Sequence, residues 1–168
     1  MSASLVGSEM CIRDSRYGIR VDEHSLHTDG AGAGEYRGGS GAVRVYRSMN
    51  ENQTFTASFG RNKWPVWGAA GGKDGSVNYF QFIDADGTVS EPMGIAARRV
   101  MNTNDVVRMV TATGGGYGNP FKRPAEKVAM DVKNEYITVK QAKADYGVLV
   151  DPETFKVLGL SLIHISEP

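Results

Sequence analysis

The residues best suited to binding or chemistry gather in three glycine-rich segments. The first, residues 29–39, reads Asp-Gly-Ala-Gly-Ala-Gly-Glu-Tyr-Arg-Gly-Gly; the second, residues 60–72, holds Gly-Arg and then Pro-Val-Trp-Gly-Ala-Ala-Gly-Gly. The third, residues 113–120, reads Thr-Gly-Gly-Gly-Tyr-Gly-Asn-Pro. Because glycine lacks a Cβ, the third run predicts a tight turn or a loop of close backbone approach.

Two nucleotide-binding glycine motifs are absent. From Gly30 the sixth position is Glu35, and the residues after it favour turn and strand, so a dinucleotide fingerprint fails. Around Gly71-Gly72-Lys73-Asp74, a phosphate-binding P-loop would need a glycine where Trp67 stands and a hydroxyl residue where Asp74 stands. We therefore expect no nucleotide site in these loops.

Metal sites have little support in the pattern. His24 and His27 share an H-x-x-H spacing, but no further histidine follows before His164, so solvated loop histidines are the favoured interpretation. The run Asp84-Ala-Asp-Gly would open a calcium loop only with an acid at its twelfth position, where Ile95 stands. We expect a hairpin turn there and no metal site.

The charged and aromatic residues of the glycine segments leave alternatives open. Asp29 and Arg37 either fasten the loop through an ion pair or hydrogen bonds, or contact a substrate or partner subunit. Tyr117 either packs against the body or closes over a site.

The two ends look foreign to the rest of the chain. Residues 1–15, MSASLVGSEMCIRDS, and 161–168, SLIHISEP, resemble translated sequencing-adapter DNA of metagenomic reads. We therefore expect one domain over residues 16–160. The single cysteine, Cys11, lies in the first of these ends, so a reducing cytoplasm is the default location. With 19 basic and 19 acidic residues and no apolar run of ~20, nothing favours nucleic acid or a membrane.

Hydrophobic periodicity predicts an α+β fold: a β-rich body with a short two-helix C-terminal appendage. Strands are expected at residues 17–21, 42–46, 54–59, 77–83 and 106–111. Pro124 predicts a helix start, with Ala125, Val128 and Val132 on one face. A second helix is expected from Thr138, whose capping box pairs with Gln141, to a left-handed Gly147.

These blocks resemble the hydantoinase B/oxoprolinase family over nearly all of residues 16–160. Residues 114–120 are similar to the family's Gly-Gly-Gly-Tyr-Gly-Asp-Pro turn, with Asn119 in place of the usual Asp. A helix follows in the family, and residues 145–148 resemble its final Asp-Tyr-Gly-Val motif. Its Asp-Ser-Gly-Gly-x-Gly-x-Tyr-Arg-Gly-Gly element is similar to residues 29–39, where Gly30 and Ala31 differ. Its Arg, Pro-Pro-Trp-Gly and Gly-Gly positions resemble residues 61–72.

The resemblance implies an ATP-dependent enzyme of A-type and B-type chains acting on a small carbonyl compound or cyclic amide. It implies that a hydantoinase A-type partner handles ATP with Mg, and that metal ligands, including those of an optional further divalent ion, lie in an upstream His- and Asp-rich region. No cofactor is expected in this piece, and the catalytic residues stay unknown. The candidate contacts to substrate or partner are Asp29, Arg37, Arg61, Gly114, Gly115, Gly116 and Tyr117.

Three functions remain open. The first is a C-terminal fragment of the B-type subunit of a hydrolase that opens a hydantoin or 5-oxoproline type of ring, inactive alone. The second is the same fragment in an ATP-dependent ketone carboxylase. The third is a non-catalytic assembly module, since residues 16–160 show no nucleophile and base pair and no ligand cluster.

Overall fold

The computed structural model describes residues 17–160, which form two compact units that alternate along the sequence. Unit 1 holds residues 17–25, 42–63 and 78–111, and unit 2 holds residues 26–41, 64–77 and 112–160. The ends predicted to be foreign, with Cys11 and His164, lie outside the described residues, and a single domain over residues 16–160 stays a prediction. No helix between residues 17 and 160 is long and apolar enough to cross a membrane.

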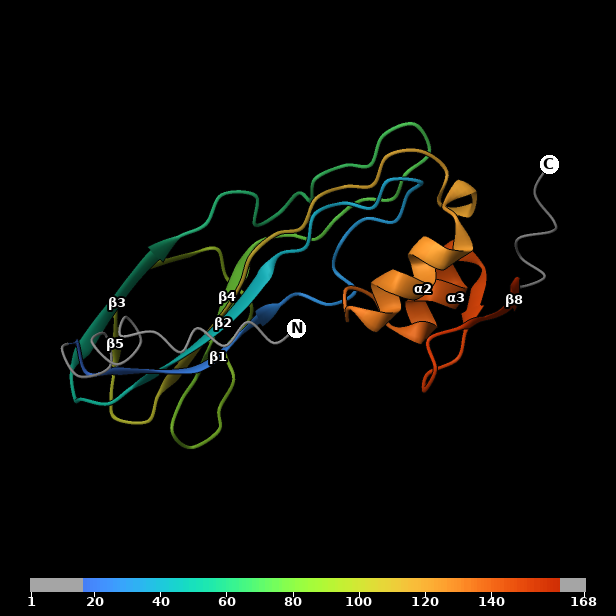
Figure 1. The fold of residues 1–168 in the computed structure, drawn as a ribbon. Helices are drawn as coiled ribbons and strands as arrows, with labels where there is room; N and C mark the ends of the chain where they lie inside the picture. The colour runs from blue at the N-terminus through green and yellow to red at the C-terminus, as the bar shows by residue number, and fades with distance from the viewer. Residues whose placement is uncertain (1–16, 161–168) are drawn as a thin grey trace. The chain divides into compact units, whose positions relative to one another are not determined.

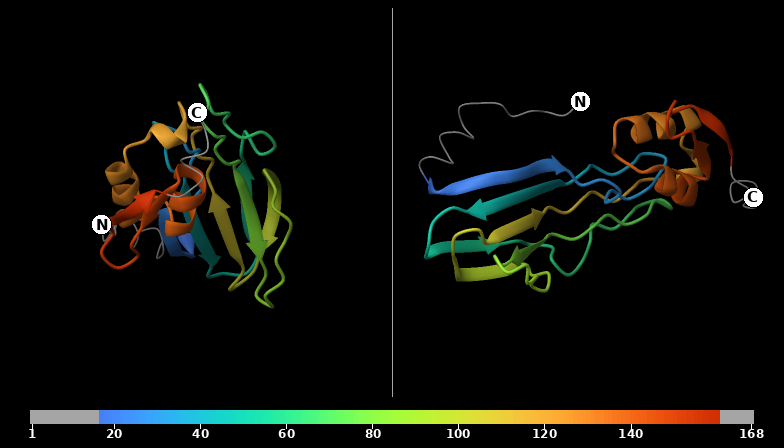
Figure 2. Two further views of the ribbon diagram at one scale, coloured as in Figure 1. Left: turned by 90° about the vertical axis from the view of Figure 1, so that its right-hand side faces the viewer. Right: turned by 90° about the horizontal axis from the view of Figure 1, so that it is seen from below.

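Unit 1 is built of two antiparallel β-sheets (Figure 1). One has the strand order β1 (Ile19–Leu26), β2 (Ala42–Ser48), β6 (Val106–Val110) and β4 (Tyr79–Ile83); the other pairs β3 (Gln53–Ser58) with β5 (Ile95–Met101). Figure 2 shows these strands as neighbouring arrows. All five predicted strands are present, although the first extends to Leu26, and β5 was not predicted.

The core of unit 1 is aromatic. Phe80 and Phe82 alternate with half-buried residues along β4 and are themselves fully buried. Phe55 from β3 meets both rings edge to face, with centroids 5.7 and 5.4 Å apart, and Phe59 meets Phe80 at 5.5 Å. Such pairs add about 0.5–1.5 kcal/mol each beyond the buried area. The two sheets are therefore held together by these rings.

The predicted turn after β4 is present. The Asp84 amide donates to the Thr88 carbonyl at 2.9 Å, and Gly87 has a φ of +90°, which a side chain would strain. The hydrogen bond from the Thr88 amide lowers the pKa of Asp86. The acidic residues of this loop thus stabilise the turn.

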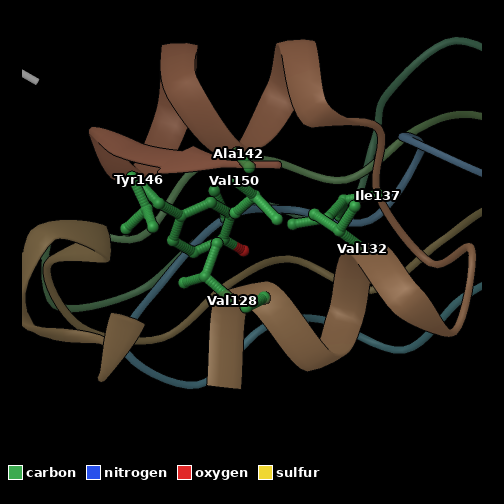
Figure 3. Close-up of a cluster of buried hydrophobic side chains, with 9 residues drawn as sticks. Val128, Val132, Ile137, Ala142, Tyr146 and Val150 are labelled. Carbon is green, nitrogen blue, oxygen red and sulfur yellow. The ribbon is translucent and has the colours of Figure 1, made fainter. Parts of the chain in front are cut away.

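Unit 2 carries the two predicted helices, α2 (Ala125–Lys133) and α3 (Val139–Tyr146), after a short 3-10 helix, η1 (Pro120–Lys122). Strands β7 (Val148–Val150) and β8 (Val157–Leu160) form an antiparallel pair that the sequence pattern did not predict. Val128 and Val132 are buried as expected, and Figure 3 shows them with Ile137, Ala142, Tyr146 and Val150. Burial raises the pKa of Tyr146 to about 12.

Candidate functional site

Parts of all three glycine segments meet inside unit 2, and we call residues 30–39, 66–75 and 113–118 the glycine core. The third segment lies between the other two. On one side, the Gly32 amide donates to the Gly114 carbonyl at 2.9 Å, so backbone contacts backbone directly.

The second segment binds the other side of the central one. The Ala69 amide donates to the Gly116 carbonyl, and the Gly116 amide donates to the Lys73 carbonyl, both at 2.9 Å. The Lys73 amide in turn donates to the Ala33 carbonyl of the first segment at 2.7 Å. All three segments are therefore joined pairwise by main-chain hydrogen bonds.

The packing of the glycine core leaves no room for side chains. A Cβ on Gly116 would lie 2.1 Å from the Ala33 oxygen, and one on Gly115 would lie 2.2 Å from the Trp67 oxygen. Neither glycine has a positive φ; in this run only Gly118 does, at +78°. The prediction of close backbone approach is confirmed, and residues 114–116 do not form a tight turn.

Thr113 adds side-chain hydrogen bonds at the start of the central segment. It is buried, and its hydroxyl accepts from the Ser76 amide at 2.7 Å and bonds the Gly30 carbonyl. One hydroxyl therefore ties the first and third segments to Ser76, the residue that follows the second segment. Sequence reasoning missed this role because nothing in the pattern separates Thr113 from other threonines.

Arg37 belongs to a buried ionic cluster. Its Nε lies 3.3 Å from Oδ2 of Asp131 on α2, and Nη2 of Arg123 lies 2.8 Å from the same oxygen. Arg37 also donates to the Gly38 carbonyl at 3.0 Å and lies over the Tyr136 ring, 4.6 Å from its centroid. Removing one partner from charges that are this largely shielded from solvent destabilises the fold. Arg37 thus fastens the first glycine segment to α2, and sequence reasoning missed both its charged partner Asp131 and the second arginine that shares this carboxylate.

Asp29 fastens the same segment to α3. Its Oδ1 accepts from the Thr138 amide at 2.6 Å, while the Thr138 hydroxyl accepts from the Gln141 amide at 3.2 Å. The predicted capping box is therefore half right: the Gln141 side chain does not return to the Thr138 amide but donates to the Asp29 carbonyl at 3.2 Å. The left-handed Gly147 at the helix end, with φ +65°, is confirmed.

The lysine next to the glycine core already has a charged partner. Lys73, the lysine tested for a P-loop, pairs through Nζ with Asp145 Oδ1 at 2.7 Å. Between residues 17 and 160, no three or more His, Cys, Asp or Glu side chains gather closely enough to hold a metal ion. His24 is exposed on β1, whereas the half-buried His27 faces Gly30.

Tyr117 is exposed at the end of the central segment. Its amide and carbonyl exchange hydrogen bonds of 2.9 and 3.0 Å with Tyr36, and the two rings lie 6.3 Å apart at 53°. The ring is 57% exposed and so is not packed into the body. Unit 2 thus brings together all the predicted contact residues except Arg61, which lies in unit 1 with a φ of +52°.

Comparison with known proteins identifies similar sequences. A family model described as hydantoinase B/oxoprolinase matches residues 6–120. An uncharacterized protein of Methanocaldococcus jannaschii is 34% identical over 137 residues, and a putative D-/L-hydantoinase B-type subunit of Pseudomonas sp. strain NS671 is 30% identical over 139. These alignments cover 82% of this chain in both cases, but 24% and 23% of the relatives. The chain therefore spans about a quarter of their length.

Two solved structures share the fold. The crystal structure of the ATP-dependent caprolactamase from Pseudomonas jessenii matches with a TM-score of 0.73 and 29% identity, covering 84% of this chain and 25% of that one. The nucleotide-free structure of acetone carboxylase matches with a TM-score of 0.75 and 18% identity, covering 92% and 25%. At that identity, the second likeness shows the fold alone.

Proposed function

Because this chain belongs to the hydantoinase B/oxoprolinase family, we propose that it is the C-terminal part of the B-type subunit of an ATP-dependent hydrolase of cyclic amides. The observation that carries the proposal is the family match over residues 6–120, and the relative named as a putative D-/L-hydantoinase B-type subunit and the solved ATP-dependent caprolactamase support it. The substrate class would be a hydantoin, 5-oxoproline or similar lactam. We further propose a cytoplasmic location, since residues 17–160 contain no cysteine.

In this proposal, activation of the amide carbonyl takes place outside these residues. Amide resonance makes a lactam carbonyl a poor electrophile, so ring opening needs activation, which a hydantoinase A-type partner would supply with ATP and Mg. The loop at Lys73 lacks the glycine and the hydroxyl residue of a P-loop, so the proposal places ATP on the partner and any further divalent metal upstream in the parent subunit. The chain alone is therefore expected to be inactive.

The contribution of this chain would be a rigid platform. Main-chain hydrogen bonds fix the glycine core, and the Arg37–Asp131 pair and the Asp29 cap attach it to the two helices. Tyr117 is the member of the predicted contact set that combines an exposed ring with a backbone fixed on both sides. It is the residue we expect to contact a substrate or another part of the assembled enzyme.

Reconstitution tests the proposal. The chain, the upstream part of its B-type subunit and the A-type subunit are combined, and the opening of hydantoin, 5-oxoproline and caprolactam is followed with and without ATP. We expect ATP-dependent ring opening in the complete complex and none with the chain alone. An assembled complex that opens none of the three rings would overturn the proposal.

A second candidate is ATP-dependent carboxylation of a ketone, which the fold likeness to acetone carboxylase keeps in view. Product formation from acetone that requires bicarbonate in the same complex would favour it over hydrolysis.

A third candidate, a non-catalytic assembly module, predicts that Tyr117→Phe leaves turnover unchanged. Loss of turnover with complex formation intact would exclude the module.

A further inference from the structure

Four large aromatic side chains of unit 2 stay exposed to solvent. Trp64, Trp67, Tyr36 and Tyr117 are 80%, 76%, 63% and 57% exposed, and we call them the aromatic set. The two tryptophans are the only ones in the chain. Tyrosine and tryptophan side chains are on average largely buried or lie at interfaces, so four of them exposed within one unit indicate a surface for a partner.

The glycine core holds most of the aromatic set in fixed positions. Tyr36 and Tyr117 share two main-chain hydrogen bonds and a ring contact. The Trp67 carbonyl abuts Gly115 of the same central segment, and the Gly118 amide, next to Tyr117, donates to the Ala69 carbonyl at 2.9 Å. A backbone fixed in this way loses little conformational freedom on binding, which is a property of a preformed interface.

The chain already covers another part of the glycine core with its own elements. Ala33 is 1% exposed and packs with buried residues of the two helices and β7. The charges next to the aromatic set are also used internally, since Lys73 pairs with Asp145 and Asp74 accepts from the Gly68 amide at 2.8 Å. Two charged groups near the aromatic set are therefore already paired within the chain, and the four exposed aromatic side chains remain for a partner.

We propose that the remainder of the same B-type subunit covers the aromatic set in the complete protein. This inference rests on the proposed function, and it names an occupant within the subunit instead of the A-type chain. The alignments leave about three quarters of each relative unmatched, so a large body of chain is available to cover it. A permanent contact of this kind would form as the subunit folds.

Tryptophan fluorescence is the test, because both tryptophans belong to the aromatic set. The 168-residue chain is titrated with the upstream part of its B-type subunit while emission and acrylamide quenching are recorded. We expect a blue shift and at least a threefold fall in the quenching constant on binding. Trp67→Ala is expected to weaken binding tenfold or more, as truncation of a central interface tryptophan does.

A matched control comes from unit 1, where Tyr17 is 61% exposed. Tyr17→Ala is expected to leave binding unchanged, and circular dichroism is used to check that both variants keep the fold. Three results overturn the inference: no binding, binding with unchanged quenching, or protection of the tryptophans by the A-type subunit or a second copy of the chain instead.

Enzyme assays separate this inference from the proposed function. A complex that opens rings with ATP while its tryptophans stay quenchable refutes the covered aromatic set and leaves the function standing. A complex with protected tryptophans and no ring opening supports the covered aromatic set and refutes the proposed function.

Discussion

Replacing Gly116 by alanine tests whether the glycine core is as tightly packed as its geometry indicates. A glycine without a positive φ usually gains about 0.4–1 kcal/mol from this change, because alanine restricts the unfolded chain. Here the new Cβ would lie 2.1 Å from the Ala33 oxygen, well below the 3.0 Å that real Cβ atoms respect. The first and third segments must therefore separate by about 1 Å.

That separation also displaces Gly116 relative to the second segment and weakens the main-chain hydrogen bonds between them. The bonds that Gly116 makes with Ala69 and Lys73 are 2.9 Å long, and each contributes about 0.5–1.5 kcal/mol, with a larger cost if a buried partner is left unpaired. We expect Gly116→Ala to lower the free energy of unfolding by about 2–4 kcal/mol, measured by urea denaturation.

Gly39 supplies the matched control in the same core. An alanine Cβ there meets no atom within 4 Å, and Gly39 has no positive φ. We expect Gly39→Ala to change the free energy of unfolding by less than about 1 kcal/mol, in the stabilising direction. Equal stabilities for the two variants would refute the tightly packed core.

Three further perturbations have expected outcomes. The pKa of Tyr146 is near 10 in the unfolded chain and about 12 in the folded one, so its contribution to the free energy of unfolding is intact below pH 10 and falls by about 2–3 kcal/mol as pH rises from 10 to 12. Tyr146→Phe should lack this loss in urea unfolding measured at several pH values. The same pH dependence in the variant would contradict the burial of Tyr146. Asp131→Asn removes the carboxylate that the guanidinium groups of Arg37 and Arg123 share and should lower the free energy of unfolding by about 3–5 kcal/mol in the same assay. Asp84→Asn, at a half-exposed ion pair, should lower it by less than about 1 kcal/mol. Similar losses in the two variants would contradict the buried cluster. Asp29→Ala should cost about 1 kcal/mol and speed hydrogen exchange at residues 138–141, while Asp29→Asn should keep most of the cap; exchange rates that do not differ would refute the cap.

Elements with local signals could be predicted from the sequence. The α3 boundaries follow from Thr138 and Gly147, whose cap chemistry involves residues only a few positions away. Strand β5 was missed because Ile-Ala-Ala-Arg-Arg-Val-Met lacks a clear alternation. Its pairing with β3 shifts register between Phe55 and Ala57, so its buried residues do not follow the period of two that a pattern search expects.

The site was less predictable because its contacts are long-range. The glycine pattern predicts close backbone approach, but it does not predict that residues 113–118 lie between the other two segments. Arg37 and Asp131 are 94 positions apart, and Asp29 caps a helix that begins more than a hundred residues later. The two units also alternate along the chain with no linker between them, so composition gives no boundary.

Ring opening with and without this chain tests the central claim most directly. A B-type subunit that lacks the part corresponding to this chain is combined with its A-type partner, ATP and 5-oxoproline or hydantoin. The 168-residue chain is then added. The account predicts no ring opening before the addition, and ATP-dependent ring opening after it. Equal activity with and without the chain, or none in a complex shown to contain all three parts, would contradict it.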